Sequence, residues 1–345
     1  MIPVAAPQAP LIFERSPMTK TLALIFDRYT LALISTVILA TLLPCRGRAA
    51  EVFEVVTNVA IALLFFLHGA KLSREAVIAG LINWRLHLLV IACTFALFPL
   101  LGWLAQPLAG AVVGTQLAVG ILFLCTLPST VQSSIAFTSI ARGNVPAAVC
   151  SASASSLIGI VLTPLLVGLL IHANADSPAP LGAIEGIVLQ LFVPFVAGQI
   201  ARRWIGGFIE RHRAVIGLVD RGSILLVVYT AFSAAVVAGL WQQVSLQTLV
   251  LLLVLCSVLL AIALFVTSQL GKRLGFSRED RITILFCGSK KSLASGVPMA
   301  NVLFASSAVG AIVLPLMLFH QVQLMVCAVL AQRYARQAAA SKGLP

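Results

Sequence analysis

The chain has 345 residues, of which 60% are apolar and only 10% are charged, whereas ordinary soluble domains contain about 25% charged residues. The mean hydropathy is +1.06, and apolar runs recur over the whole length. This composition excludes a soluble domain with a single anchor and indicates a chain that crosses the lipid bilayer many times. The net charge of +12 does not indicate nucleic-acid binding, because Lys and Arg stand in short segments between apolar runs.

A membrane-spanning helix needs about 20 apolar residues, with a range of roughly 17 to 25, because its backbone must satisfy its own hydrogen bonds. Such a window predicts an all-α membrane protein with ten transmembrane helices. The expected spans are residues 29–44, 56–71, 86–104, 117–140, 145–172, 181–200, 222–241, 246–270, 282–303 and 306–331. The first twenty residues lack the small-residue cleavage site of a signal peptide, so we expect the first span to be retained. Residues 1–28 are expected to form a cytoplasmic segment and residues 332–345 a cytoplasmic tail.

Basic residues predict the orientation. If alternate loops and both termini share one side, that side carries nineteen of the 23 Lys and Arg residues. The other side carries Arg46 and Arg48 alone, and Lys290 and Lys291 fall inside the ninth span. The positive-inside rule therefore places both termini in the cytoplasm of a multi-pass protein of the inner (plasma) membrane.

Ten spans divide into two halves of five, residues 29–172 and 173–331. A long basic loop at 201–221 leads to the seventh span. Because five is odd, a second half with the same fold enters the membrane from the opposite side. This arrangement is the inverted repeat of many secondary transporters.

The fourth span of the first half and the ninth span, its counterpart in the second, are interrupted by polar stretches. Pro128 cannot donate a backbone hydrogen bond, and Gly288 and Pro298 flank the polar part of the ninth span. Interrupted backbone survives in lipid only where protein buries it or where it lines a cavity, so the pair predicts a binding site at the membrane midplane. The polar residues at these breaks are Ser129, Thr130, Gln132, Ser133 and Ser134, and Ser289, Lys290, Lys291, Ser292 and Ser295.

Several stretches resemble the bile acid:sodium symporter superfamily and, within it, the SBF-like subgroup that includes the seventh member of animal solute carrier family 10. They are LFFLHGAKLSREA, WRLHLLVIACTFALFPL, TLPSTVQSSIAFTSIARGN, SLIGIVLTPLL and FCGSKKSLASGVPM. The resemblance implies two inverted five-helix repeats, with a core of spans 3–5 and 8–10 and a panel of spans 1, 2, 6 and 7. It also implies that broken helices 4 and 9 cross near the centre of the core.

The resemblance also implies ion ligands. In sodium-coupled members a Ser-Asn pair follows the fourth-span break, and here Ser133 and Ser134 match it, so one hydroxyl remains and the amide is lost. The hydroxyl positions of the fifth span fall on alanines, although Ser151 and Ser155 lie four apart on one helical face in a different register. Serines in membrane helices also serve packing alone, and that interpretation stays open for these two.

The ninth span has no carboxylate near its break, where sodium-coupled members have a glutamate, and Lys290 and Lys291 stand there instead. A charge at mid-bilayer costs ~2.5–3.5 kcal/mol, so an intramembrane lysine is a functional candidate. The alternative is a structural counter-charge to helix C-terminal carbonyls. We predict that transport is sodium-independent or proton-linked. As the lysine that takes up and releases a proton we favour Lys291, because it lies deeper past Gly288. No other cofactor is expected than Na⁺ or H⁺ as a coupling ion.

Other polar residues give weaker signals. Tyr229, Thr230 and Ser233 form a patch in the seventh span that would line a cavity on the panel side, and three histidines are expected to be helix-end or packing residues. The histidines are His68, His87 and His320. Glu185 is expected at an interface, and Arg46, Arg48, Glu51 and Glu54 in a solvated outer loop.

Two classes of function remain. The first is a secondary active transporter that moves a small organic anion by alternating access, with half-helix N-termini and lysines attracting the anion. The second is a membrane regulator of cation (calcium) homeostasis that transports no substrate. An enzyme or an ATP-driven pump is not expected, because the chain lacks a Ser-His-Asp set, an H-E-x-x-H motif and a P-loop. The cysteines have no metal-binding spacing and are expected to be small buried hydrophobes.

Overall fold

The computed structural model describes residues 28–71, 83–171 and 188–340, and every regular element in these ranges is a helix. The expectations for the N-terminal segment, for Glu185 and for the start of the sixth span lie outside the described residues. The helices are α2 (Arg28–Leu42), α3 (Arg48–Lys71), α5 (Trp84–Ala92), η1 (Cys93–Leu97), α6 (Phe98–Val113), α7 (Thr115–Thr126), α8 (Gln132–Ile140), α9 (Val145–Leu170), η3 (Val188–Phe192), α11 (Val193–Arg211), α12 (Arg213–Val237), α13 (Leu240–Gln243), α14 (Leu246–Arg273), α15 (Arg278–Gly288), α16 (Leu293–Leu303) and α17 (Ser306–Ala340).

Six helices in the described ranges are long and apolar enough to cross a membrane. They are Arg48–Lys71, Trp84–Val113, Val145–Leu170, Arg213–Val237, Leu246–Arg273 and Ser306–Ala338. Two further apolar helices, Leu31–Leu42 and Thr115–Thr126, are shorter. An all-helical membrane protein is therefore confirmed, while the ten-helix inverted repeat stays a prediction.

Several helices extend beyond the apolar runs that predicted them, so two predicted loops are wrong and part of the expected tail is helical. The outer loop with Arg48, Glu51 and Glu54 is the exposed start of α3, where the negative charge of Glu51 faces the positive end of the helix dipole. The basic loop at 201–221 is the end of α11 and the start of α12. The tail from residue 332 continues α17 to Ala340. Apolar runs report the length that lipid covers, whereas backbone hydrogen bonding continues into water.

The stretch between the third and fourth predicted spans, residues 105–116, for which we expected an outer loop, is also mostly helix. Helix α6 runs to Val113, and Gly114 alone separates it from α7. Gly114 has φ of +85°, a conformation that costs a residue with a Cβ atom much more than glycine. One residue therefore makes the turn for which the sequence suggested a loop.

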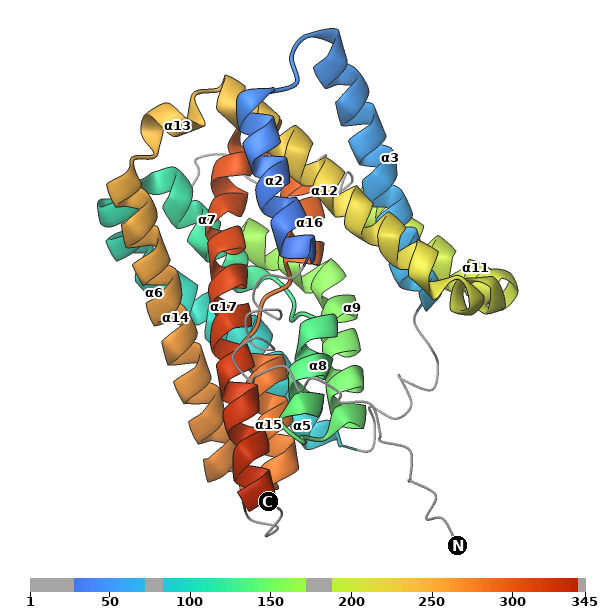
Figure 1. Cartoon of the computed structure of the whole chain (residues 1–345), viewed down its shortest axis with the longest axis vertical. Helices are drawn as coiled ribbons and strands as arrows, with labels where there is room; N and C mark the ends of the chain where they lie inside the picture. The colour runs from blue at the N-terminus through green and yellow to red at the C-terminus, as the bar shows by residue number, and fades with distance from the viewer. Residues whose placement is uncertain (1–27, 72–82, 172–187, 341–345) are drawn as a thin grey trace, which may run out of the picture.

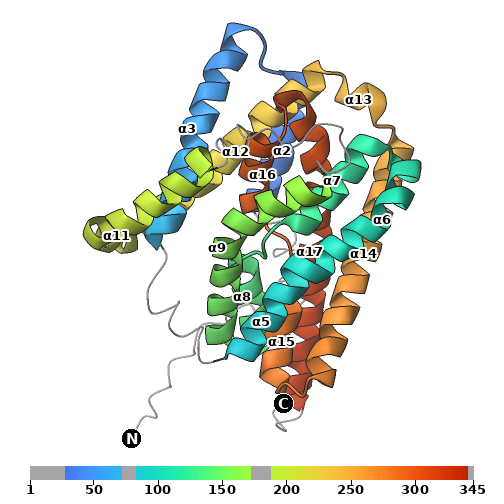
Figure 2. The ribbon, with the colours of Figure 1, turned by 180° about the vertical axis from the view of Figure 1, so that it is seen from behind.

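Helices α2, α3, α11 and α12 pack on one another at one side of the molecule, and we call them the lateral group (Figures 1 and 2). Helices α3 and α11 touch backbone to backbone. A Cβ atom added to Gly69 would collide with the carbonyl of Phe195, and one added to Gly198 would collide with the carbonyl of Phe66. The two glycines therefore fix how closely these helices approach.

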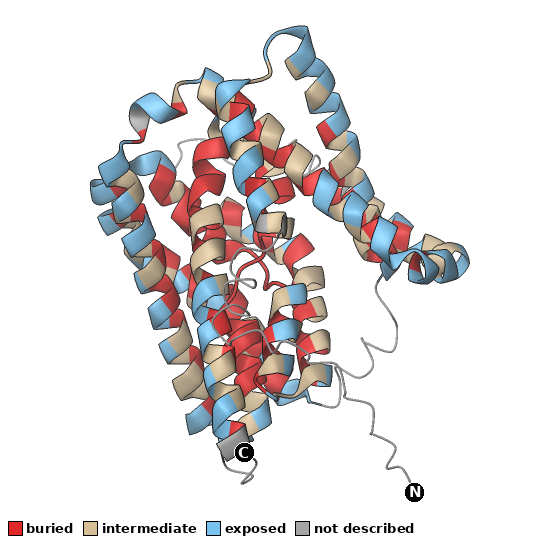
Figure 3. Ribbon diagram, in the orientation of Figure 1, coloured by how far each residue is buried: buried red, intermediate tan, exposed pale blue. Residues whose placement is uncertain are grey.

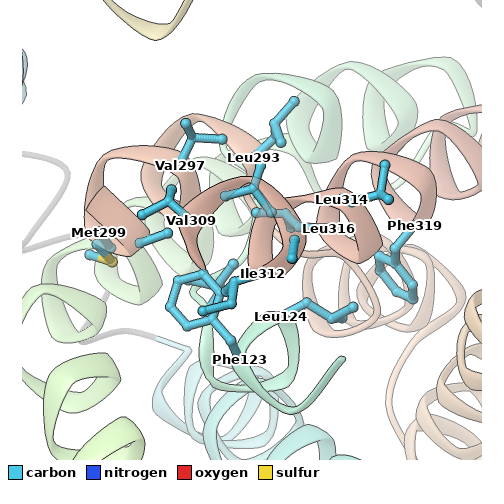
Figure 4. Packing of buried hydrophobic residues seen from close by; sticks show 14 of the residues in the cluster. Phe123, Leu124, Leu293, Val297, Met299, Val309, Ile312, Leu314, Leu316 and Phe319 are labelled. Atoms are coloured by element: carbon cyan, nitrogen blue, oxygen red, sulfur yellow. The ribbon is translucent and has the colours of Figure 1, made fainter. Parts of the chain in front are cut away.

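The main apolar core extends over many helices, and Figure 4 shows the part of it in which side chains of α7, α16 and α17 pack together. Phe123 and Phe319 are fully buried there, and Leu293 and Ile312 nearly so. Figure 3 shows exposed residues along the outer faces of the helices, and many of the exposed residues are leucines and valines. An apolar outer face around a packed core is the arrangement that a lipid environment requires.

Candidate functional site

Two helix interruptions face each other in the middle of the molecule. Residues 127–131 separate α7 from α8, and residues 289–292 separate α15 from α16, as the paired Pro- and Gly-containing stretches predict. The backbone N–H of Ser292 donates to the carbonyl of Pro128 at 2.9 Å. Ser129 Oγ donates to the Cys287 carbonyl at 2.5 Å, and Ser134 Oγ donates to the Phe286 carbonyl at 2.9 Å. Each break thus satisfies backbone groups that the other exposes.

Lys291 is fully buried, and its ammonium group binds three backbone carbonyls. Nζ donates to Thr94 and Cys125 at 2.8 Å and to Leu127 at 2.7 Å. It also lies 4.2 Å from the centroid of the Phe98 ring. Three charge-assisted hydrogen bonds use all three protons of the ammonium.

The local sequence explains why these carbonyls are available. In the π-helix η1 the N–H of Phe98 bonds to the carbonyl of Cys93, and Pro99 has no N–H for Thr94. At the end of α7 the N–H of Ser129, four residues after Cys125, donates to Ser155 Oγ at 3.0 Å. Lys291 therefore supplies donors where two helices lack them.

The backbone of Lys291 is held by a side-chain amide. Gln323 Oε1 accepts from the Lys291 N–H, and Gln323 Nε2 donates to the Lys291 carbonyl, both at 2.9 Å. Gln323 is itself fully buried on α17. The unwound residue is thus bonded on both of its backbone groups.

Lys290 is also fully buried but has different surroundings. Its Nζ donates to Ser133 Oγ at 3.2 Å. The ammonium lies 4.4 Å from the ring centroid of Phe137 and 5.7 Å from that of Phe286. Aromatic faces stabilise a cation, and one hydroxyl accepts from it, so this lysine is held less rigidly than its neighbour.

A cavity of about 350 Å³ lies between the lateral group and the two breaks. Its lining from the lateral group is Tyr29, Leu64, His68, Gly217, Asp220, Arg221 and Ile224. From the other side it is Thr130, Val131, Gln132, Ser133, Ala136, Phe137, Ser156, Ser292, Leu293, Ala294, Ser295, His320 and Leu324. This volume lies in the usual range of small-molecule pockets, about 300–1,000 Å³.

Charges on the lateral wall come from α3 and α12. Asp220 forms an ion pair with Lys71 through Oδ2, while its Oδ1 is buried without a hydrogen-bond partner in the described part of the chain. The guanidinium of Arg221 stacks over Tyr29 at 5.8 Å. The wall that faces the breaks therefore carries a cation and a paired carboxylate.

The structure divides the residues predicted at the site into two sets. Those that line the cavity are Thr130, Gln132, Ser133, Ser292 and Ser295. Those that are fully buried away from it are Ser129, Ser134, Ser151, Ser155, Ser289, Lys290 and Lys291. Members of the second set bond to the protein itself: Ser151 Oγ bonds to His87 Nδ1 at 2.7 Å, and Ser289 Oγ donates to the Leu285 carbonyl at 2.5 Å.

The predicted patch on the seventh span does not line this cavity. Tyr229 Oη donates to the Leu43 carbonyl at 2.8 Å, and the hydroxyls of Thr230 and Thr57 bond to each other at 2.9 Å. The cavity residues of α12 lie nearer its start, from Gly217 to Ile224.

Asp220 and Arg221 are cavity residues that the sequence did not indicate as site residues, and Ser156, for which packing alone was an open interpretation, lines the cavity too. His68, expected only at a helix end, also lines it. The one available signal was Asp220, a carboxylate at the edge of an apolar run in a chain with eleven acidic residues. No group of three potential metal ligands occurs in the described ranges.

Comparison with known proteins agrees with this picture. The chain is 68% identical over 311 residues to "Uncharacterized protein PA2026" of Pseudomonas aeruginosa, and the aligned region covers 90% of this chain and 93% of that protein. It is 56% identical over 313 residues to "Putative symporter YfeH" of Escherichia coli, with coverage of 91% and 94%. It is 31% identical over 280 residues to "Sodium/bile acid cotransporter 7" of Rattus norvegicus, with coverage of 80% and 82%.

The sequence profile of one family matches residues 27–336, which is nearly the whole chain. Together with the relatives, this match confirms the resemblance to SBF-like proteins. The chain belongs to the SBF-like CPA transporter family.

Proposed function

We propose that this protein is a secondary active transporter of a small organic anion, and that the anion binds in the 350 Å³ cavity beside the two breaks. The observation that carries the proposal is that the N-termini of two half-helices line this one cavity. Val131 precedes α8, which begins with Gln132 and Ser133, and Ser292 precedes α16, which begins with Leu293. Helix N-termini carry partial positive charge and free N–H groups, which attract anions.

The caps of these half-helices support an open anion site at α8. At α16 the hydroxyl of Ser292 accepts from the N–H of Ser295 at 3.2 Å. At α8 the residue before the helix, Val131, provides no side-chain cap. The first N–H groups of α8 thus have no side-chain acceptor at the cap, and Arg221 supplies a cation from the opposite wall.

The place of the cavity supports alternating access. One wall belongs to the lateral group and the other to the broken helices with α17, so relative movement of the two would open the site to either side. Ile224 and Ala294 lie on opposite walls. In the variant with Ile224→Cys and Ala294→Cys, a reducible cross-linker should stop transport, and reduction should restore it. Undiminished transport in the cross-linked protein would contradict a moving wall.

We propose that coupling does not use a sodium ion at the breaks. The Lys291 ammonium binds three carbonyl oxygens of the kind that coordinate a hard cation. It therefore occupies the place that a sodium ion would take and supplies the positive charge there. Proton coupling through Lys290, whose hydroxyl partner Ser133 lines the cavity, is the alternative to ion-independent transport. Uptake should be equal in sodium and in choline, and a steep sodium dependence that survives Lys290→Ala and Lys291→Ala would overturn this part of the proposal.

The binding site is tested with two substitutions on one helix. Ser133 lines the cavity, whereas Ser139, also on α8, is exposed and does not. An organic anion is first identified by thermal stabilisation of the purified protein, and its counterflow is then measured in proteoliposomes. Ser133→Leu should abolish counterflow with near-normal folding, and Ser139→Leu should leave it unchanged.

Other outcomes are equally informative. Equal loss of counterflow in both variants would contradict the assignment of the cavity. No counterflow of any stabilising anion in the wild-type protein would favour the second class of function, regulation of cation homeostasis. We further propose, from the positive-inside rule, that the protein lies in the inner membrane with both termini on the cytoplasmic side.

A further inference from the structure

A second cavity, of about 410 Å³, lies at the end of the molecule where α14 and α17 end and α15 begins. In Figure 1 this is the lower end, marked by the label of α15 and by the letter C of the C-terminus. Its lining is dominated by four cations: Lys272 from α14, Arg278 and Arg281 from α15, and Arg333 from α17. These four belong to the nineteen basic residues that the positive-inside rule assigns to the cytoplasmic side.

Among the described residues, no side-chain carboxylate lines this cavity to balance its charge. The ion pairs between described residues are Lys71–Asp220 and Glu210–Arg213, and neither involves the four cations. Helix α15 has two acidic residues in its first turn, of which Glu279 is exposed and Asp280 accepts from Asn144 Nδ2 at 2.8 Å. Like charges gathered around one hollow attract an anion from the surroundings.

Polar groups of the lining are held in place by hydrogen bonding between helices. Arg278 Nη2 donates to the carbonyl of Tyr334 at 3.0 Å, which ties the start of α15 to α17. Ser268 and Gln337 add a hydroxyl and an amide to the lining. Guanidinium, ammonium and hydroxyl groups around one space are the donors that bind phosphate oxygens well.

Apolar side chains continue from this cavity along the outside of the helices. Phe265 precedes Ser268 by three residues on α14, and Val326 precedes Leu330 by four on α17, so each shares a helix face with a lining residue. Phe265 is 64% exposed and Val326 is 36% exposed. A ligand with an anionic head and apolar tails would meet complementary surface along its whole length.

We propose that this cavity binds the phosphate-bearing headgroup of an anionic phospholipid, whose acyl chains lie along α14 and α17. Basic pockets between transmembrane helices on the cytoplasmic side suit such headgroups. The site is separate from the cavity beside the breaks, and it requires nothing of the transported substrate. Free phosphate shares the headgroup chemistry but not the apolar contacts, so the two ligands are separable by experiment.

The test uses the delipidated full-length protein in detergent and compares two double variants with equal loss of charge. Lys272→Gln with Arg333→Gln removes two lining cations. Arg273→Gln with Arg336→Gln removes two exposed cations of the same helix ends that do not line the cavity. Binding of phosphatidylglycerol is titrated by thermal stabilisation and counted by native mass spectrometry. Phosphatidylcholine and inorganic phosphate are the reference ligands.

We expect phosphatidylglycerol to stabilise the wild type and the control pair alike. The lining pair should bind it about 25-fold more weakly, at about fivefold for each cation removed. Equal weakening in both pairs, equal binding of phosphatidylcholine, or full stabilisation by inorganic phosphate alone would each overturn the proposal. If the double variant does not fold, the single variant Lys272→Gln, at an exposed residue, is compared with Arg273→Gln.

Discussion

The adjacent lysines of the ninth-span break predict a large difference in stability between two identical substitutions. In Lys291→Met the side chain keeps its length but leaves three buried carbonyls, those of Thr94, Cys125 and Leu127, without the donor that they share. Each orphaned group costs about 1–3 kcal/mol, a gross loss of about 3–9 kcal/mol. The desolvation of the ammonium, which the variant no longer bears, offsets part of this loss. After this offset we expect the free energy of unfolding to fall by about 3–5 kcal/mol.

Lys290→Met is the matched control. Its hydroxyl partner, Ser133 Oγ, also donates to Thr130 Oγ1 at 2.8 Å and therefore keeps a partner in the variant. The lost contacts with Phe137 and Phe286 are worth up to about 2 kcal/mol, and they are offset because an isolated ammonium no longer has to be buried. We expect the free energy of unfolding to fall by less than about 2 kcal/mol.

The cysteines provide the assay. Six of them are buried, namely Cys93, Cys125, Cys150, Cys256, Cys287 and Cys327. A thiol-reactive fluorescent dye therefore reports unfolding as the protein is heated in detergent. Lys291→Met should lower Tm far more than Lys290→Met. Equal Tm values for the two variants, or a Lys291→Met protein as stable as the wild type, would refute the assignment of Lys291 as the donor to these carbonyls.

Three further predictions concern packing, capping and the vacated ammonium site. Gly69→Ala and Gly198→Ala should each destabilise the protein by about 1–3 kcal/mol in the same dye assay, because the added Cβ meets a backbone carbonyl of the other helix. Gly207→Ala, which meets open space, should change stability by no more than about 1 kcal/mol. Asn144→Ala should cost about 2–3 kcal/mol, since it removes both the cap of α9 and the bond to an aspartate. Lys291→Ala should gain stabilisation by sodium chloride over choline chloride that the wild type lacks, and no difference between the salts would contradict a carbonyl-lined cation site.

Features that depend on local composition were predictable from the sequence. The helix breaks follow from Pro128 and Gly288, and the burial of two lysines follows from their place in an apolar run. The lengths of the helices did not follow, because α11, α12 and α17 continue into charged segments that a lipid-based window excludes. The turn at Gly114 was not predicted, because a single glycine makes it and no polar stretch marks its position in the sequence.

Features that depend on pairing between distant segments were not predictable. Lys291 and Thr94 are 197 residues apart in sequence and meet only in the folded chain. The signal for a free carbonyl is present, since Pro99 deprives Thr94 of a partner, but nothing local says which donor replaces it. The preference for Lys291 as the group that exchanges a proton rested on depth alone, whereas its three bonds to backbone carbonyls favour the alternative interpretation, a structural counter-charge.

The two lysines differ because the chain between α15 and α16 is not helical. Residues 289–292 are unwound, so successive side chains diverge: Lys291 reaches the end of α7, while Lys290 reaches Ser133 on α8. One dipeptide thereby supplies a cation bound to backbone carbonyls and a cation joined to the cavity by one hydroxyl. Substrate that displaces or reorients Ser133 would change the hydrogen bond of Lys290 but leave Lys291 untouched. In the proposed cycle, therefore, Lys291 holds the broken helices together in every state, and any coupling of the anion to a proton passes through Lys290.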